Sequence, residues 1–185
     1  MIARPLLLMA IPLLLSGCVR DRFDILVGGD IYNAKILSDP STVEARGTTI
    51  RLKPGARLAI KTALTTQWLG QYEVSIVEGT GMNVYLRTVS HKFTGDSSVV
   101  FRWATDGCSV RSSSGRTVPL DVNAELDRQT LSFYNEAALL TISAGCGRVY
   151  EEQSPLPATE YVILETLPNS IVDITAIAYF DSNVE

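Results

Sequence analysis

The sequence predicts an all-β protein, folded as a two-sheet antiparallel β-sandwich of the jelly-roll type with little helix. From residue 48 onward, apolar and polar residues alternate with a period of two in roughly ten short segments, the pattern of half-buried strands. Gly, Pro, Asn and Asp lie between these segments, where short connections need them. No segment has the periodicity of a long helix. The spacing leaves the strand order open.

The first 17 residues have the features of a secretion signal rather than of a folded element. Arg4 precedes an apolar run from Leu6 to Leu15, which is too short to cross a bilayer as a helix. The run ends in Leu15-Ser16-Gly17-Cys18, where two small residues give a peptidase room at the scissile bond. We therefore predict a signal peptide over residues 1–17. An ordinary secretory signal followed by a chance cysteine is the alternative.

This four-residue stretch resembles the lipobox of bacterial lipoproteins. The resemblance implies cleavage before Cys18, acylation of its sulfur and amine, and attachment of an exported protein to the bacterial envelope. Val19 is not the aspartate that marks retention at the inner membrane, so the resemblance favours the outer membrane.

Composition limits the partners of the mature chain, residues 18–185. Arg4 leaves with the signal, so 15 basic and 20 acidic residues remain, a formal charge of −5. This balance, with no basic stripe, argues against a nucleic-acid partner and does not favour anionic lipid headgroups. Membrane attachment is therefore expected to rest on the acyl chains.

Residues 18–47 are predicted to hold the lipidated cysteine, a short tether and a first strand from Phe23 to Val27. Residues 48–185 are predicted to form a single sandwich domain. Near its start, Lys53-Pro54-Gly55 is predicted to be a turn, because Pro fixes its own φ and Gly accepts a positive one.

Two hairpins and two closing strands are predicted further along. Glu78-Gly79-Thr80-Gly81 joins two alternating segments and predicts a β-hairpin. Gln129 to Ser143 predicts a second hairpin with its turn at Asn135-Glu136. Glu160 to Thr166 and Ile171 to Phe180 are the predicted closing strands.

The alternation assigns side chains to two faces of each strand. The residues predicted to point inward are Tyr72, Val74, Ile76, Val84, Leu86, Val99, Phe101, Trp103, Leu131 and Phe133. Those predicted to point outward are Glu73, Ser75, Tyr85, Arg87, Arg102, Ser132 and Tyr134. The outward residues share a surface only if their strands lie in one sheet.

Four outward residues, Tyr85, Arg87, Arg102 and Tyr134, are the predicted ligand-binding residues. Aromatic rings offer a platform for the C–H face of a sugar, and guanidinium groups donate paired hydrogen bonds to hydroxyls or carboxylates. The alternatives are a solvated face with Arg–Glu pairs and a patch covered by another protein.

Between Gln71 and Phe180 the succession of strands resembles concanavalin-like and laminin-G-like jelly rolls, a fold shared by many lectins and some glucanases. The resemblance is carried by Tyr72-Glu73-Val74-Ser75-Ile76, Met82-Asn83-Val84-Tyr85-Leu86-Arg87, Val99-Val100-Phe101-Arg102-Trp103 and the closing strand. It implies a curved sheet that in relatives often binds glycans, sometimes with calcium. The Glu-x-Asp-x-x-Glu carboxylates of the hydrolytic members are missing from this sequence, which disfavours an enzyme.

No catalytic residue is assigned from the sequence. His91 is the single histidine, and no Gly-x-Ser-x-Gly sequence accompanies it. Glu151 and Glu152 are adjacent, so on a strand they point to opposite faces and are expected to be solvated rather than paired for catalysis.

Cys108 and Cys146 are predicted to form a disulfide, because they are an even pair in an exported chain. Closing the loop between them would stabilise the fold by roughly 4 kcal/mol. Two thiols and one histidine are too few for a zinc site. No cofactor or metal is assigned, although the oxygen-rich loops at Asp106, Asp121 and Asp181 leave calcium open.

Two functions of different class follow from these observations. The first is a non-catalytic binding module for glycan or cell-wall polysaccharide. The second is a structural or accessory subunit that docks onto an envelope protein complex through a sheet face or a free edge strand. A glycoside hydrolase is a distant third.

Overall fold

The computed structural model describes residues 34–61, 67–88, 98–122, 124, 128–136, 138–145, 147–153 and 161–181. Cys18, the strand expected from Phe23 to Val27, His91 and Cys146 lie outside these ranges. In the part of the chain that is described, no helix has the length and apolar character needed to cross a membrane.

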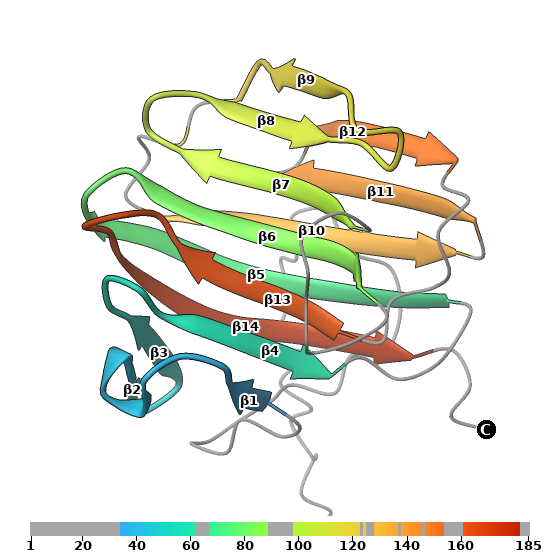
Figure 1. Ribbon diagram of the computed structural model, residues 1–185. Coiled ribbons are helices and arrows are strands. Elements are labelled where there is room, and N and C mark those ends of the chain that lie inside the picture. Colours follow the sequence, from blue (N-terminus) through green and yellow to red (C-terminus); the bar gives the residue numbers. More distant parts are fainter. Residues whose placement is uncertain are drawn as a thin grey trace, which may run out of the picture.

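Two seven-stranded antiparallel sheets pack face to face, which confirms the predicted sandwich (Figure 1). The front sheet contains, in spatial order, β1 (Ala34–Ile36), β4 (Arg57–Lys61), β13 (Tyr161–Thr166), β6 (Gly81–Thr88), β7 (Val99–Ala104), β8 (Cys108–Arg111) and β9 (Thr117–Leu120). The back sheet contains β12 (Gly147–Gln153), β11 (Leu139–Ala144), β10 (Gln129–Glu136), β5 (Gln67–Glu78), β14 (Ile171–Asp181), β3 (Thr49–Leu52) and β2 (Val43–Arg46). A 3-10 turn, η1 (Pro40–Thr42), precedes β2.

The segment 18–47, predicted as tether and first strand, contributes an edge strand to each sheet. β1 pairs with β4 in the front sheet, and β2 pairs with β3 in the back sheet. Among the described residues the sandwich therefore begins before residue 48.

The space between the sheets is filled by the inward residues that the alternation predicted. All ten belong to the main hydrophobic cluster or pack against it. Phe133 of the back sheet lies 5.9 Å from Phe101 of the front sheet and 6.0 Å from Tyr72, measured between ring centroids. Aromatic pairs of this kind contribute about 0.5–1.5 kcal/mol each beyond the area they bury. The Phe101–Phe133 pair joins the two sheets, and the Tyr72–Phe133 pair joins β5 and β10 within the back sheet.

The connection between β5 and β6 is not the predicted hairpin. β5 belongs to the back sheet and β6 to the front sheet, so the chain crosses between layers at Gly79 and Thr80. The hydroxyl oxygen of Ser170 accepts hydrogen bonds from the backbone N–H of Thr80 at 2.9 Å and of Gly81 at 3.0 Å. A connection with two glycines can form either a corner between two sheets or a hairpin within one sheet. The sequence pattern does not distinguish these two structures.

Other predicted local features are confirmed. At Lys53-Pro54-Gly55 the N–H of Ala56 donates to the carbonyl of Lys53 at 2.9 Å, and Gly55 has a φ of 80°. β10 and β11 form the second hairpin, although its turn lies after Glu136 rather than at Asn135-Glu136. The two closing strands are β13 and β14.

Candidate functional site

The four predicted ligand-binding residues do not share a surface. Tyr85 and Arg102 lie on β6 and β7 of the front sheet, whereas Tyr134 lies on β10 of the back sheet. Arg87 is completely buried. The condition for a common face, that these strands lie in one sheet, is therefore not met, because the chain changes sheets between them.

Arg87 is buried because β6 has one extra residue relative to β13. Tyr85 pairs with Ile163 and Thr88 with Tyr161, so two residues of β6 oppose one residue of β13. The φ of Arg87 is 60°, a left-handed conformation typical of such a bulge. Burial lowers the pKa of the Arg87 guanidinium, and the negative charge of Glu152 opposes this effect. Arg87 is therefore a structural residue.

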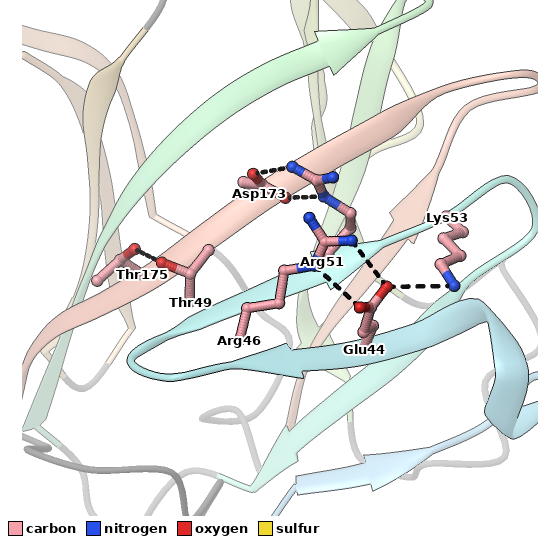
Figure 2. Close-up of polar contacts among 7 residues, drawn as sticks. All are labelled: Glu44, Arg46, Thr49, Arg51, Lys53, Asp173 and Thr175. Atoms are coloured by element: carbon pink, nitrogen blue, oxygen red, sulfur yellow. Dashed lines mark hydrogen bonds and ion pairs between the residues drawn. The ribbon is translucent and has the colours of Figure 1, made fainter.

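The outer face of the back sheet carries matched charges (Figure 2). Arg51 donates through Nε and Nη2 to the two carboxylate oxygens of Asp173 at 2.7 and 2.6 Å. Glu44 forms ion pairs with Arg46 at 3.0 Å and with Lys53 at 3.3 Å. The two Glu44 pairs are exposed and contribute about 0–1 kcal/mol each, whereas the Arg51–Asp173 pair is partly buried. The exposed part of this face fits the alternative of a solvated surface.

Tyr134 lies on the same side of the back sheet as these pairs. Its hydroxyl donates to Oε2 of Glu136 at 3.0 Å, a contact that is open to solvent. It is therefore separated from Tyr85 and Arg102 by the whole thickness of the sandwich.

The outer face of the front sheet has a small apolar cluster of its own. Ala59, Ile163 and Tyr85 are buried in a group separate from the main core. They are register partners across β4, β13 and β6. The neighbouring residues Leu58 and Leu164 belong to the main core, so alternation puts the small cluster on the opposite side of the sheet. Partly exposed hydrophobic residues pack around it: Leu37, Val100 and Tyr161.

A row of polar side chains crosses the same face one level away from this cluster. In the register of the sheet, Arg57 lies opposite Glu165, Glu165 opposite Asn83, and Asn83 opposite Arg102. These residues belong to the adjacent strands β4, β13, β6 and β7. We call these four residues the polar row. Because neighbouring strands lie about 4.8 Å apart, the row spans roughly 14 Å.

Glu165 is the hydrogen-bonded centre of the polar row. Its Oε1 accepts from Nε and Nη2 of Arg57 at 3.1 and 2.5 Å, and its Oε2 accepts from the hydroxyl of Tyr85. Burial and the bond to Glu165 raise the pKa of Tyr85 to about 12. With a cation on one oxygen and a hydroxyl donor on the other, both carboxylate oxygens are engaged as hydrogen-bond acceptors in a fixed position.

Arg102 ends the polar row in a fixed position. Its Nη1 donates to the carbonyl oxygen of Gly107 at 2.5 Å, and its Nη2 donates to Oδ2 of Asp106 at 2.8 Å.

Asp106 was one of the oxygen-bearing residues that left calcium open. In the described part of the chain, no three His, Cys, Asp or Glu side chains gather into a metal-binding group.

Among the described residues, Cys108 is a buried free thiol. Its Sγ contacts the carbonyl oxygen of Ala104 at 3.7 Å, and burial raises the pKa of the thiol. The expected partner, Cys146, lies outside the described residues, so the pairing stays a prediction.

Three members of the polar row were missed by sequence reasoning: Arg57, Asn83 and Glu165. Glu165 lies 80 residues from Tyr85 and 108 residues from Arg57 in the sequence. The alternation of Tyr161, Ile163 and Glu165 indicates a common face, but their partners depend on β13 lying between β4 and β6.

Comparison with solved structures places the fold. The structure superposes on a protein from Parabacteroides distasonis, provisionally described as a glycosyl hydrolase, with a TM-score of 0.68 and 12% identity over 87% of this chain and 100% of that one. It superposes on the VIP36 exoplasmic/lumenal domain, solved with Ca²⁺ and Man3GlcNAc bound, with a TM-score of 0.61 and 13% identity over 89% of this chain and 92% of that one.

The carbohydrate-binding module CBM66 of Bacillus subtilis is also similar, with a TM-score of 0.55 and 7% identity over 80% of this chain and 96% of that one. At these identities the likeness is one of fold, and it confirms the expected resemblance to concanavalin-like jelly rolls. No protein-family profile matches the chain. No curated protein sequence matches it either.

Proposed function

We propose that the chain is a non-catalytic glycan-binding module that is exported and held at the bacterial envelope, on the outer membrane, by lipid on Cys18. The observation that carries the binding function is the outer face of the front sheet, where the polar row lies beside partly exposed apolar groups. Sugars need both: hydrogen-bond donors and acceptors for their hydroxyls and an apolar contact for their C–H faces.

The groups of the polar row are accessible enough to meet a ligand. The side chains of Arg57, Glu165 and Arg102 retain 35%, 26% and 31% of their exposure. Their positions are fixed by the contacts among themselves and with Tyr85 and Asp106, so little conformational entropy would be lost on binding. The likeness in fold to a domain solved with Man3GlcNAc bound and to a carbohydrate-binding module supports the same reading.

The hydrogen-bond partners of Glu165 support a binding role over hydrolysis. A glycosidase needs two carboxyl groups flanking the scissile bond, one of them protonated with a raised pKa. Glu165 instead accepts from a guanidinium and a phenol, and the nearest acid along the polar row, Asp106, forms an ion pair with Arg102.

A glycan array with the detergent-solubilised lipidated protein tests this proposal. We expect binding that is weakened about fivefold or more by Asn83→Ala, because one amide of the polar row is lost. Ser132→Ala on the opposite outer face is the matched control and should bind normally. If no glycan binds, or if both variants behave alike, the proposal is wrong.

Intact-mass analysis of the membrane fraction tests the anchor. A chain beginning at Cys18 and carrying acyl groups is expected, with Cys18→Ser releasing the protein from the membrane. An unmodified, soluble chain would contradict the anchoring.

A structural or accessory subunit is the second candidate, and the back sheet supplies the observation that favours it. β12 pairs with β11 on one side and forms the edge of the sheet, with seven residues available to an added strand. A stoichiometric partner in a pull-down from mild detergent would support this function, and Val149→Pro in β12 should release that partner.

A further inference from the structure

The two outer faces of the sandwich differ in their balance of charge. On the front sheet, Lys35 is the register partner of Ala59, and Arg111 is the register partner of Val100. Both therefore lie on the outer face at the level of the small apolar cluster. Among the strand residues of this face whose side chains the structure describes, four are bases and one is an acid: Lys35, Arg57, Arg102 and Arg111 against Glu165, with Asp106 beside Arg102 as a second acid.

The outer face of the back sheet shows no such excess of bases. Its strand residues with described side chains include three bases against five acids: Arg46, Arg51 and Arg148 against Glu44, Glu73, Glu136, Glu151 and Asp173. The whole chain has a formal charge of −4. An acidic protein thus concentrates surplus positive charge on the face that carries the polar row.

The bases lie on both sides of a neutralised centre. Lys35 and Arg57 occupy β1 and β4 on one side of β13, while Arg102 and Arg111 occupy β7 and β8 on the other side of β6. Between them, the charge of Glu165 is already met by Arg57 and by the hydroxyl of Tyr85. A ligand that crosses the strands would therefore meet bases on both sides of this carboxylate.

We infer that the ligand of this face is an acidic glycan, whose sugars carry carboxylate groups. This inference rests on the proposed function and names its substrate class. Guanidinium and ammonium groups form charge-assisted hydrogen bonds with carboxylates that are about twice as strong as those with neutral hydroxyls. The net negative charge of the rest of the protein disfavours polyanions elsewhere, so the acidic chain is directed to this face.

Paired oligosaccharides test the inference with the lipidated protein in neutral detergent. Oligogalacturonate and oligomannuronate are each compared with their methyl esters, which keep the sugar backbone and remove the charge. Isothermal titration calorimetry should show at least one acid form binding about tenfold or more tightly than its ester. That preference should shrink as the salt concentration rises.

Two lysine variants locate the effect. Lys35→Gln should weaken binding of the acid form about two- to fivefold and leave the ester unchanged. Lys53→Gln, which removes an exposed base from the opposite side of the molecule, should leave both unchanged.

The inference is overturned if no acid form binds better than its ester, or if the two lysine variants have equal effects. Neutral glycans that still bind in the array, and are lost with Asn83→Ala, would then leave the proposed function standing. If no sugar of either kind binds, the proposed function and the inference both fail.

Discussion

The hydroxyl of Tyr85 donates a hydrogen bond to Oε2 of Glu165, a residue 80 positions later in the sequence. Arg57 occupies the other oxygen of the same carboxylate. Side chains thereby connect β6, β13 and β4 across the outer face of the front sheet, at the centre of the polar row. The contact fixes the acceptor around which a ligand would be bound.

Removing this hydrogen bond should cost stability. Tyr85→Phe keeps the ring and deletes the donor to Glu165, and we expect the free energy of unfolding to fall by about 1–2 kcal/mol in urea denaturation. Tyr134→Phe deletes a solvent-exposed bond to Glu136 and should change it by less than about 0.5 kcal/mol. An equal loss in both variants would contradict the role of Tyr85.

Tyr85 should also make stability depend on alkaline pH. Its pKa is raised from 10.0 to about 12 in the folded protein, because burial and the bond to Glu165 disfavour the phenolate. The stabilisation is present in full below pH 10 and is lost as the pH rises through 12. Between these values the wild type should lose more stability than Tyr85→Phe. Parallel profiles of unfolding free energy against pH would show that the pKa is not raised.

Arg87 should respond to substitution as a buried residue in a left-handed conformation. Arg87 was a predicted ligand-binding residue, but because its guanidinium is fully buried we expect Arg87→Ala to lower stability. Arg87→Gly removes the same side chain and relaxes the backbone, whose φ is 60°. We expect Gly to be more stable than Ala here by about 1 kcal/mol in thermal unfolding. If Arg87→Ala is the more stable variant, Arg87 does not have the left-handed conformation of a bulge.

The corner between β5 and β6 depends on Gly81. A Cβ at this position would lie 2.1 Å from the carbonyl oxygen of Trp103, and the φ of 142° is unfavourable for other residues. Gly81→Ala should therefore destabilise the protein by roughly 2–5 kcal/mol. Gly115→Ala has a positive φ in open space and should cost only about 1–2 kcal/mol. If the two variants have similar midpoints of chemical denaturation, the connection between β5 and β6 is a hairpin rather than a corner.

The predicted disulfide between Cys108 and Cys146 is tested by peptide mapping of the exported protein without reduction. We expect a linked peptide pair, and reduction should lower the free energy of unfolding by as much as about 4 kcal/mol. Two alkylatable thiols in the unreduced protein would show that Cys108 keeps the buried thiol seen in the structure.

The sequence by itself determined the fold class, the inward face of the core and the strands that carry it, but not the edge strands β1, β2, β9 and β12. Period-two alternation assigned Val84, Phe101 and Phe133 to the interior correctly, because the side-chain geometry of a strand is local. The same reasoning failed at Arg87, since a one-residue bulge reverses the alternation and depends on the register with β13.

Tertiary structure alone decided which strands are neighbours, and with them the candidate site. Glu165 meets Tyr85 and Arg57 because β13, which comes late in the chain, lies between β6 and β4. Tyr134 resembles Tyr85 in its local pattern, yet β10 lies in the other sheet. Pairing between distant strands is set by the packing of the whole core, and local sequence periodicity carries no information about it.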